Sequence, residues 1–150
     1  MVLSWTHHLN KYYRDGHSDL VDYVAPWPNH AYWATTRSDQ IGWQIAHFLP
    51  AVVLWIKAWV DYADSHRDRV LVTSYETMFK GQREFVLSLA DFFELSIPTT
   101  FDPDKYRSEK NHFRKGKIDE WKEAFSESQM RQAEAAIPNS LMHRFGWAAT

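Results

Sequence analysis

The stretch Arg114-Lys115-Gly116 carries the clearest chemistry in this sequence. Arg114 offers a planar guanidinium that can hold two phosphate oxygens at once, and Lys115 offers a compact point charge. Gly116 adds a backbone N–H that no side chain shields. Together these groups are suited to gripping a phosphate. A basic tripeptide is also common in solvated loops, so its surroundings must decide between the two interpretations.

Metal and thiol chemistry are not indicated. The eight histidines form no H-E-x-x-H or other recognised ligand spacing, and the chain has no cysteine, so we predict no metal site. His7 and His8 lie near Ser4 in the sequence, but we expect surface or packing roles for them, and no catalytic residue is assigned. The absence of cysteine fits a reducing compartment, and we expect a cytoplasmic protein.

The residues that follow the basic tripeptide extend the pattern. Residues 114–122 resemble the signature Arg-Lys-Gly-x-x-Gly-x-Trp-Lys of the PAPS-dependent sulfotransferases. In that family the stretch binds the 3′-phosphate of the donor, 3′-phosphoadenosine 5′-phosphosulfate (PAPS). The resemblance therefore implies a donor-binding role for Arg114, Lys115 and Gly116. One position departs, because Asp119 stands where the family has its second glycine and carries the same sign of charge as the ligand.

Further segments resemble the same family in the same order. Ser4 matches the serine of its 3′-phosphate motif, where a hydroxyl near a helix start can join the backbone donors in holding an anion. Tyr75 matches a tyrosine that follows a strand and lies against the adenosine end of the donor. Thr99 and Phe101 resemble the residues that flank the adenine, although Phe101 would equally serve to anchor a loop.

The resemblance implies a fold and an activity. The fold class is mostly α with one or few β-strands, as the C-terminal portion of an α/β P-loop-like sulfotransferase fold. Residues 1–150 would then form a partial domain that lacks the N-terminal part binding the 5′-phosphosulfate. The activity implied is transfer of a sulfuryl group from PAPS to a hydroxyl or amine acceptor, and we expect the chain alone to be inactive. The family's Lys-containing phosphate loop and catalytic histidine are not found in these residues.

Two other classes of function are consistent with the same residues. The chain could be a noncatalytic protein that binds phosphoadenosine or a partner protein through the 3′-phosphate clamp. It could also be a helical protein-interaction module, which would have no affinity for phosphoadenosine. A phosphate loop and a histidine in upstream sequence would favour the enzyme. The acceptor stays open, because acceptor loops vary within one fold.

Composition narrows the range of partners. The chain has the length of one ordinary domain, and its formal net charge of −2 provides no broad basic field for nucleic acid and no polybasic segment for anionic lipid. The longest apolar run, Phe48 to Val60, is shorter than the roughly 20 residues of a membrane span. The first residues lack the pattern of a signal peptide. We expect a soluble protein with no nucleic-acid or membrane partner.

Hydrophobic periodicity and capping residues predict several helices. The first helix runs to Gly16, and an aromatic loop with room for a short helix covers Val24 to Asp39. A helix from Ile41 to Tyr62 should be kinked or divided at Pro50. Further helices are predicted from Thr77 to Glu94, from a capping box at Ser126 and Gln129, and from a cap at Ser140 to Gly146.

One convincing strand is predicted. Val70 to Tyr75 has the β-branched, nearly continuous apolar composition of a strand buried in a parallel sheet. The resemblance implies that the other strands lie in the missing N-terminal part. Without them the strand would expose unpaired backbone groups to other chains, so self-association is expected.

Overall fold

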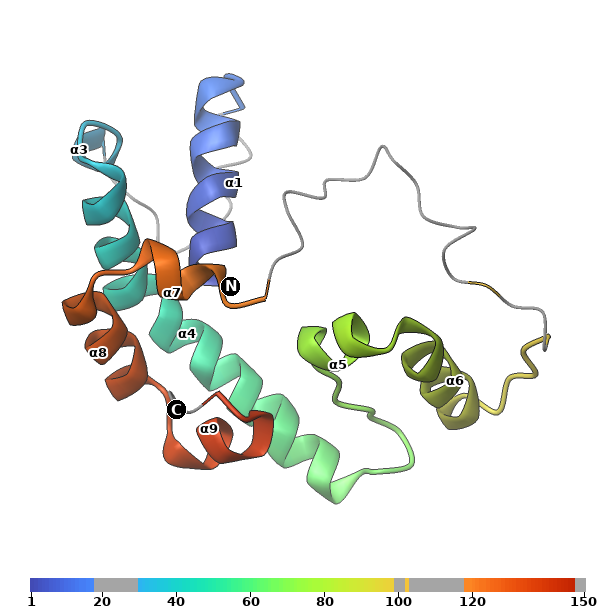
Figure 1. Cartoon of the computed structure of the whole chain (residues 1–150). Coiled ribbons are helices and arrows are strands. Elements are labelled where there is room, and N and C mark those ends of the chain that lie inside the picture. The colour runs from blue at the N-terminus through green and yellow to red at the C-terminus, as the bar shows by residue number, and fades with distance from the viewer. Residues whose placement is uncertain (18–29, 99–101, 103–117, 148–150) are drawn as a thin grey trace. The chain divides into compact units, whose positions relative to one another are not determined.

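The computed structural model describes residues 1–17, 30–98, 102 and 118–147, and these residues are mostly helical (Figure 1). No β-strand occurs among them. The helices are α1 (Val2–Arg14), α3 (His30–Trp33), α4 (Arg37–Ser65), α5 (Tyr75–Lys80), α6 (Gln82–Phe92), α7 (Glu120–Ala124), α8 (Glu127–Ala136) and α9 (Asn139–Phe145). The chain forms two compact units: unit 1 holds Met1–Lys57 and Asp119–Thr150, and unit 2 holds Ala58–Ile118.

Helix α1 confirms the predicted opening helix. Its buried residues recur at the three- and four-residue spacing of one helical face: Val2, Leu3, Thr6 and Leu9. It ends at Arg14, and Gly16, two residues later, has a φ of 76° in the left-handed region that favours glycine. The N–H of Gly16 donates to the Tyr13 carbonyl at 3.3 Å, and the N–H of His17 donates to the Tyr12 carbonyl at 3.0 Å. These two bonds satisfy carbonyls that the end of a helix leaves without partners.

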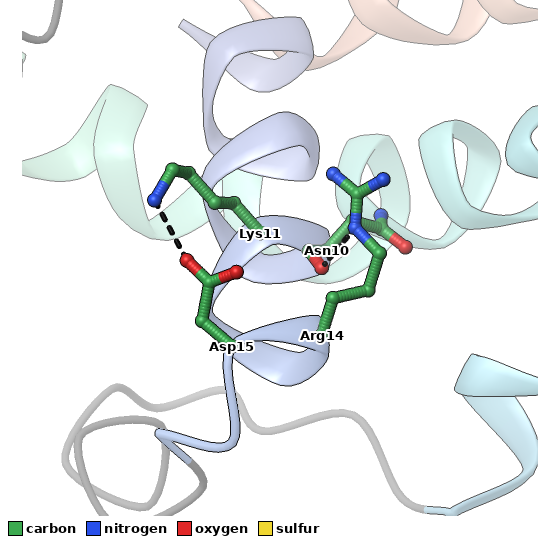
Figure 2. A network of polar contacts seen from close by, with 4 residues as sticks. All are labelled: Asn10, Lys11, Arg14 and Asp15. Atoms are coloured by element: carbon green, nitrogen blue, oxygen red, sulfur yellow. Dashed lines mark hydrogen bonds and ion pairs between the residues drawn. The ribbon is translucent and has the colours of Figure 1, made fainter.

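The exposed side of α1 carries a local polar network (Figure 2). Lys11 Nζ lies 2.7 Å from Asp15 Oδ2, and Arg14 Nε donates to the Asn10 carbonyl at 3.3 Å. The hydrogen bond from Lys11 is the largest cause that holds the pKa of Asp15 below its ordinary value of 3.8. Both partners are exposed, so this pair adds little to the stability of the fold.

Helix α4 is continuous through Pro50, so the predicted division of this helix is wrong. Proline cannot donate to the carbonyl four residues earlier, which is that of Ala46. The side chains of Ala46 and Pro50 are both exposed, so the lost bond falls on the solvent-facing side, where water can replace it. The opposite side keeps a buried row at four-residue spacing: Ile41, Ile45, Leu49 and Val53. This packing holds the helix together across the proline.

Helix α4 is also long and apolar enough to cross a membrane by length and composition alone. An 18-residue window of it has a mean hydropathy of 1.3, and 28% of that window is buried. Core helices of soluble proteins pass the same criterion. The expectation that the chain has no membrane partner therefore stays a prediction.

A buried polar network joins α1, α3 and α4 within unit 1. Asn10 Nδ2 donates to Gln40 Oε1 at 2.7 Å, and Gln40 Nε2 donates to the Tyr32 carbonyl at 3.2 Å. Gln44 Nε2 donates to the Tyr32 hydroxyl oxygen at 3.2 Å, while Gln44 Oε1 is buried with no hydrogen-bond partner. Burial raises the pKa of Tyr32, and the hydrogen bond from Gln44 opposes that shift. Stacked rings of Trp5 and Phe48, with centroids 5.3 Å apart, add an apolar contact between α1 and α4.

Helix α8 confirms the predicted capping box and is attached to α4. The N–H of Gln129 donates to Ser126 Oγ at 3.2 Å, and Gln129 Oε1 accepts from the N–H of Ser126 at 2.9 Å. The Nε2 group of the same side chain donates to the Ser38 carbonyl at 2.8 Å. Helix α9 begins after Pro138 rather than at a Ser140 cap, so that prediction is wrong; its end at Gly146, with φ 64°, is confirmed.

Two predicted elements of unit 2 are wrong. Residues 70–74 form no strand, because no segment among the described residues pairs with them, and Tyr75 begins a helix instead of ending a strand. The helix predicted from Thr77 to Glu94 is two helices separated at Gly81. Glycine is among the weakest helix formers, so the chain departs from helical geometry there at low cost. Ser74 caps α5 by accepting from the N–H of Thr77 at 3.1 Å.

The Tyr32 hydroxyl tests the buried network. We expect Tyr32→Phe to lower the free energy of unfolding by about 1–3 kcal/mol, because Gln44 then keeps two buried polar atoms without partners. Adding Gln44→Met should recover most of that loss, since both polar groups are then replaced by apolar ones. Urea denaturation of both variants measures the difference. A double variant less stable than Tyr32→Phe would contradict this account.

The Lys11–Asp15 pair gives a pH prediction. Since the folded-state pKa of Asp15 is lowered, its stabilising contribution is present above the ordinary value of 3.8 and is lost as the pH falls through the folded-state pKa. Lys11→Gln should move the Asp15 pKa back toward 3.8, as measured by NMR titration of the carboxyl carbon. Arg14→Gln is the matched comparison, because Arg14 lowers the Asp15 pKa through its charge but donates its hydrogen bond to Asn10. Equal shifts in the two variants would show that charge alone, without the hydrogen bond, sets the pKa.

Candidate functional site

Most of the predicted donor-binding residues lie outside the residues that the structure describes; they are Arg114, Lys115, Gly116, Thr99 and Phe101. Ser4 and Tyr75 are described, and so is the end of the signature from Asp119 to Lys122. Ser4 and residues 119–122 belong to unit 1, whereas Tyr75 belongs to unit 2. The structure therefore assigns two of the matched segments to one compact unit and leaves Tyr75 unrelated to them.

Ser4 lies in the first turn of α1, with its side chain exposed. Its hydroxyl stands at the end of the helix where the unpaired N–H groups and the positive end of the dipole favour anions. No side chain caps this end: Met1 precedes the helix, and its carbonyl accepts from the N–H of Trp5 at 2.9 Å. A hydroxyl in this place can donate a hydrogen bond to a phosphate oxygen.

The fold also brings the guanidinium of Arg37 to α1, which no sequence motif predicted. Arg37, at the start of α4, contacts His7 through its Nη2 atom and the Nε2 atom of the imidazole. His7 lies one turn after Ser4 on α1. Since arginine only donates, the contact is a hydrogen bond when Nε2 is the unprotonated ring nitrogen. No motif links residues 7 and 37, so only the pairing of α1 with α4 could have indicated this contact.

Tyr75 is the first residue of α5, and its side chain is exposed. Its ring lies 6.0 Å from that of Phe79, centroid to centroid, at an angle of 39°. The two rings form one exposed aromatic surface on α5. Such a surface suits a flat ligand such as an adenine ring.

Asp119 adopts the backbone conformation that its glycine counterpart would favour. Its φ of 64° and ψ of 12° are left-handed, a region that most residues avoid but Asp and Asn tolerate. The family's glycine at this signature position is the residue best suited to the same geometry. Asp119 therefore forms a left-handed turn directly before α7.

The charge of Asp119 is partly offset by the signature's own lysine. Lys122 Nζ lies 3.1 Å from Asp119 Oδ2 and 5.6 Å from the centroid of the Trp121 ring. Both charged groups are about half exposed, so the pair is worth less than about 1 kcal/mol. The main effect of the pair is electrostatic, because the Lys122 ammonium lies beside the Asp119 carboxylate and partly cancels its charge. The repulsion that Asp119 would exert on a bound phosphate is correspondingly reduced.

Several of the described histidines lie against aromatic rings. The imidazole of His66 stacks on Tyr62 at 4.0 Å, that of His47 lies 4.4 Å from Trp43, and that of His8 stacks on Tyr12 at 5.7 Å. In the part of the chain that the structure describes, no group of three or more His, Cys, Asp or Glu side chains is placed to hold a metal ion. The geometry thus indicates packing roles for these three histidines.

The left-handed turn at Asp119 can be tested by substitution. Asp119→Gly should change the free energy of unfolding by less than about 1 kcal/mol, because relief of the backbone strain offsets the added freedom of the unfolded chain. Asp119→Val should lower it by about 1–2 kcal/mol, since a β-branched residue is strained at positive φ. Urea denaturation of the two variants measures the contrast. Equal stabilities would show that residue 119 is not held in the left-handed conformation.

Comparisons with known proteins add no relative to this description. No family model matches the chain, no curated protein matches it, and no solved structure matches it.

Proposed function

We propose that this chain holds the 3′-phosphoadenosine end of PAPS in a sulfotransferase. The reaction would transfer a sulfuryl group to a hydroxyl or amine acceptor. The observation that carries the proposal is the signature spacing of residues 114–122 together with the left-handed turn at Asp119. A turn of this geometry explains why the signature would use glycine at the position that aspartate occupies here.

The charge requirement of the donor supports a local site. The whole chain has a formal net charge of −2, so a phosphate must be held by cations gathered at one place. Arg114 and Lys115 supply two adjacent cations, and Ser4 supplies a hydroxyl in the first turn of α1. By the resemblance, Arg114, Lys115, Gly116 and Ser4 are the proposed ligands of the 3′-phosphate.

The proposed role is to position the donor rather than to break its bond. In sulfuryl transfer the acceptor oxygen or nitrogen loses its proton to a base and attacks sulfur. The bond from sulfur to the phosphate oxygen then breaks, and 3′,5′-diphosphoadenosine (PAP) leaves with the electron pair. Binding the remote 3′-phosphate supplies energy for orienting the donor in line with the acceptor. No residue of this chain is proposed as the base, and the chain alone is expected to be inactive.

Adenosine would be held separately from the 3′-phosphate. Tyr75 and Phe79 offer an exposed aromatic surface on α5, and Thr99 and Phe101 are the proposed contacts of the adenine edge and face. Stacking of an adenine on one aromatic ring contributes about 1–3 kcal/mol. Because any nucleobase can stack on an aromatic ring, selectivity for the donor must come from its phosphates.

Binding of PAP tests the proposal. PAP at 100 times its dissociation constant should stabilise the fold by about 2.7 kcal/mol, measured as a shift in thermal unfolding. Arg114→Ala should reduce the shift strongly, because it removes a bidentate phosphate ligand. Arg131→Ala is the matched control, since Arg131 is an exposed arginine on α8 that lies 3.7 Å from Glu127 and is not a proposed ligand.

The ligand also has a matched control. Adenosine 5′-monophosphate lacks the 3′-phosphate, so it should give a much smaller shift than PAP at the same concentration. Equal shifts for the two nucleotides would remove 3′-phosphate recognition from the proposal. Equal shifts for wild type and Arg114→Ala with PAP would remove Arg114 from the site.

A further inference from the structure

Residues 70–74, here called the open segment, connect α4 to α5 within unit 2 and have the character of a strand without a sheet (Figure 1). Burial alternates along it: Val70, Val72 and Ser74 are half-buried, and Leu71 and Thr73 are exposed. Ser74 has an extended backbone with φ −118° and ψ 154°. This two-residue period is the pattern of a strand with one face against its own unit.

The two backbone edges of the open segment differ in their hydrogen bonds. On one edge, the N–H of Val70 donates to the His66 carbonyl at 3.1 Å, and the Ser74 carbonyl accepts from the N–H of Met78 at 3.2 Å. On the other edge, the N–H and C=O groups of Leu71 and Thr73 make no hydrogen bond to any residue that the structure describes. In an extended chain alternate residues direct these groups to the same side, so the four groups form one row.

We infer that the Leu71–Thr73 edge pairs with the same edge of a second copy of this chain, antiparallel, about a two-fold axis at Val72. In this register Leu71 of each copy lies opposite Thr73 of the other, and each such pair exchanges two hydrogen bonds. The ladder then has four hydrogen bonds between the copies. Every unpaired group of this edge is satisfied, and Val72 faces its own symmetry mate in the closely spaced, non-hydrogen-bonded pair.

Charge disfavours the parallel arrangement. Asp68 and Arg69, which lie 3.6 Å apart, precede the open segment, and Glu76 follows it in the first turn of α5. In the antiparallel register Arg69 lies opposite Tyr75 of the other copy and Asp68 lies opposite Glu76, so Asp68 opposes the attraction between Arg69 and Glu76. Parallel pairing would instead set Arg69 beside Arg69 and Glu76 beside Glu76, which is unfavourable.

The sequence of the open segment also suits a second copy as the occupant. Val70-Leu71-Val72-Thr73-Ser74 contains no charge and no proline, the residues that commonly protect an exposed edge from other chains. A pairing with two-fold symmetry uses one edge of each copy and therefore closes at the dimer. A five-residue ladder makes a small interface, so the dimer is weak and reversible.

Two charged variants test the pairing at exposed positions. In Leu71→Lys/Thr73→Lys, like charges lie directly opposite one another in both cross-strand pairs, and the same holds for Leu71→Glu/Thr73→Glu. Sedimentation equilibrium over a series of concentrations should show a monomer–dimer equilibrium for the wild type. Each charged variant should dimerise roughly tenfold more weakly. An equimolar mixture of the two variants should restore dimerisation, because every opposed pair then joins Lys to Glu.

The mixture also guards against misfolding, since variants that failed to fold would not recover by mixing. Far-UV circular dichroism should show equal helix content for both variants and the wild type. A wild-type chain that stays monomeric at all concentrations would overturn the inference, and so would a mixture that does not restore dimerisation. Growth beyond the dimer would overturn the two-fold pairing. None of these measurements depends on PAP binding.

Discussion

The carboxamide of Gln129 ties together two parts of unit 1 that are far apart in the sequence. Its oxygen completes the cap of α8, and its Nε2 group donates to the carbonyl of Ser38, 91 positions earlier in the chain. One side chain therefore both starts a helix and attaches it to α4. Only 8% of Gln129 is exposed, so loss of either bond would leave a buried polar atom without a partner. This contact joins the first and last parts of the chain within unit 1.

The elements that could be predicted from the sequence are those whose cause is local. The capping box at Ser126 needs only its own neighbours, and Gly16 and Gly146 mark helix ends because few other residues accept their backbone conformation. Predictions failed where distant contacts decide. Pro50 is tolerated because the opposite face of α4 is buried, and Val70 to Tyr75 forms no strand because strands require partners that no described residue supplies.

In the candidate site, too, some features are visible in the sequence and others require the fold. The spacing of Arg114, Trp121 and Lys122 is visible in the sequence because the signature that it resembles is a short, continuous motif. The contact between Arg37 and His7 is not, since it requires α1 and α4 to lie together. Asp119 shows a third case: its departure from the signature is visible in the sequence, but its left-handed backbone is seen only in the structure.

The glycines that end α1 and α9 have a consequence for the stereochemistry of the chain. A Cβ added at Gly16 or Gly146 would meet no atom within 4 Å, although φ is +76° and +64° at the two positions. These positions therefore require a positive φ, but they do not require a small side chain. A mirror-image residue such as D-alanine prefers positive φ and would fit the space, and it would reduce the conformational freedom that glycine gives the unfolded chain. Most L-amino acids avoid positive φ, so a chain of L-residues does not gain this stabilisation. Glycine at both helix ends therefore carries the entropic cost of its freedom in the unfolded chain.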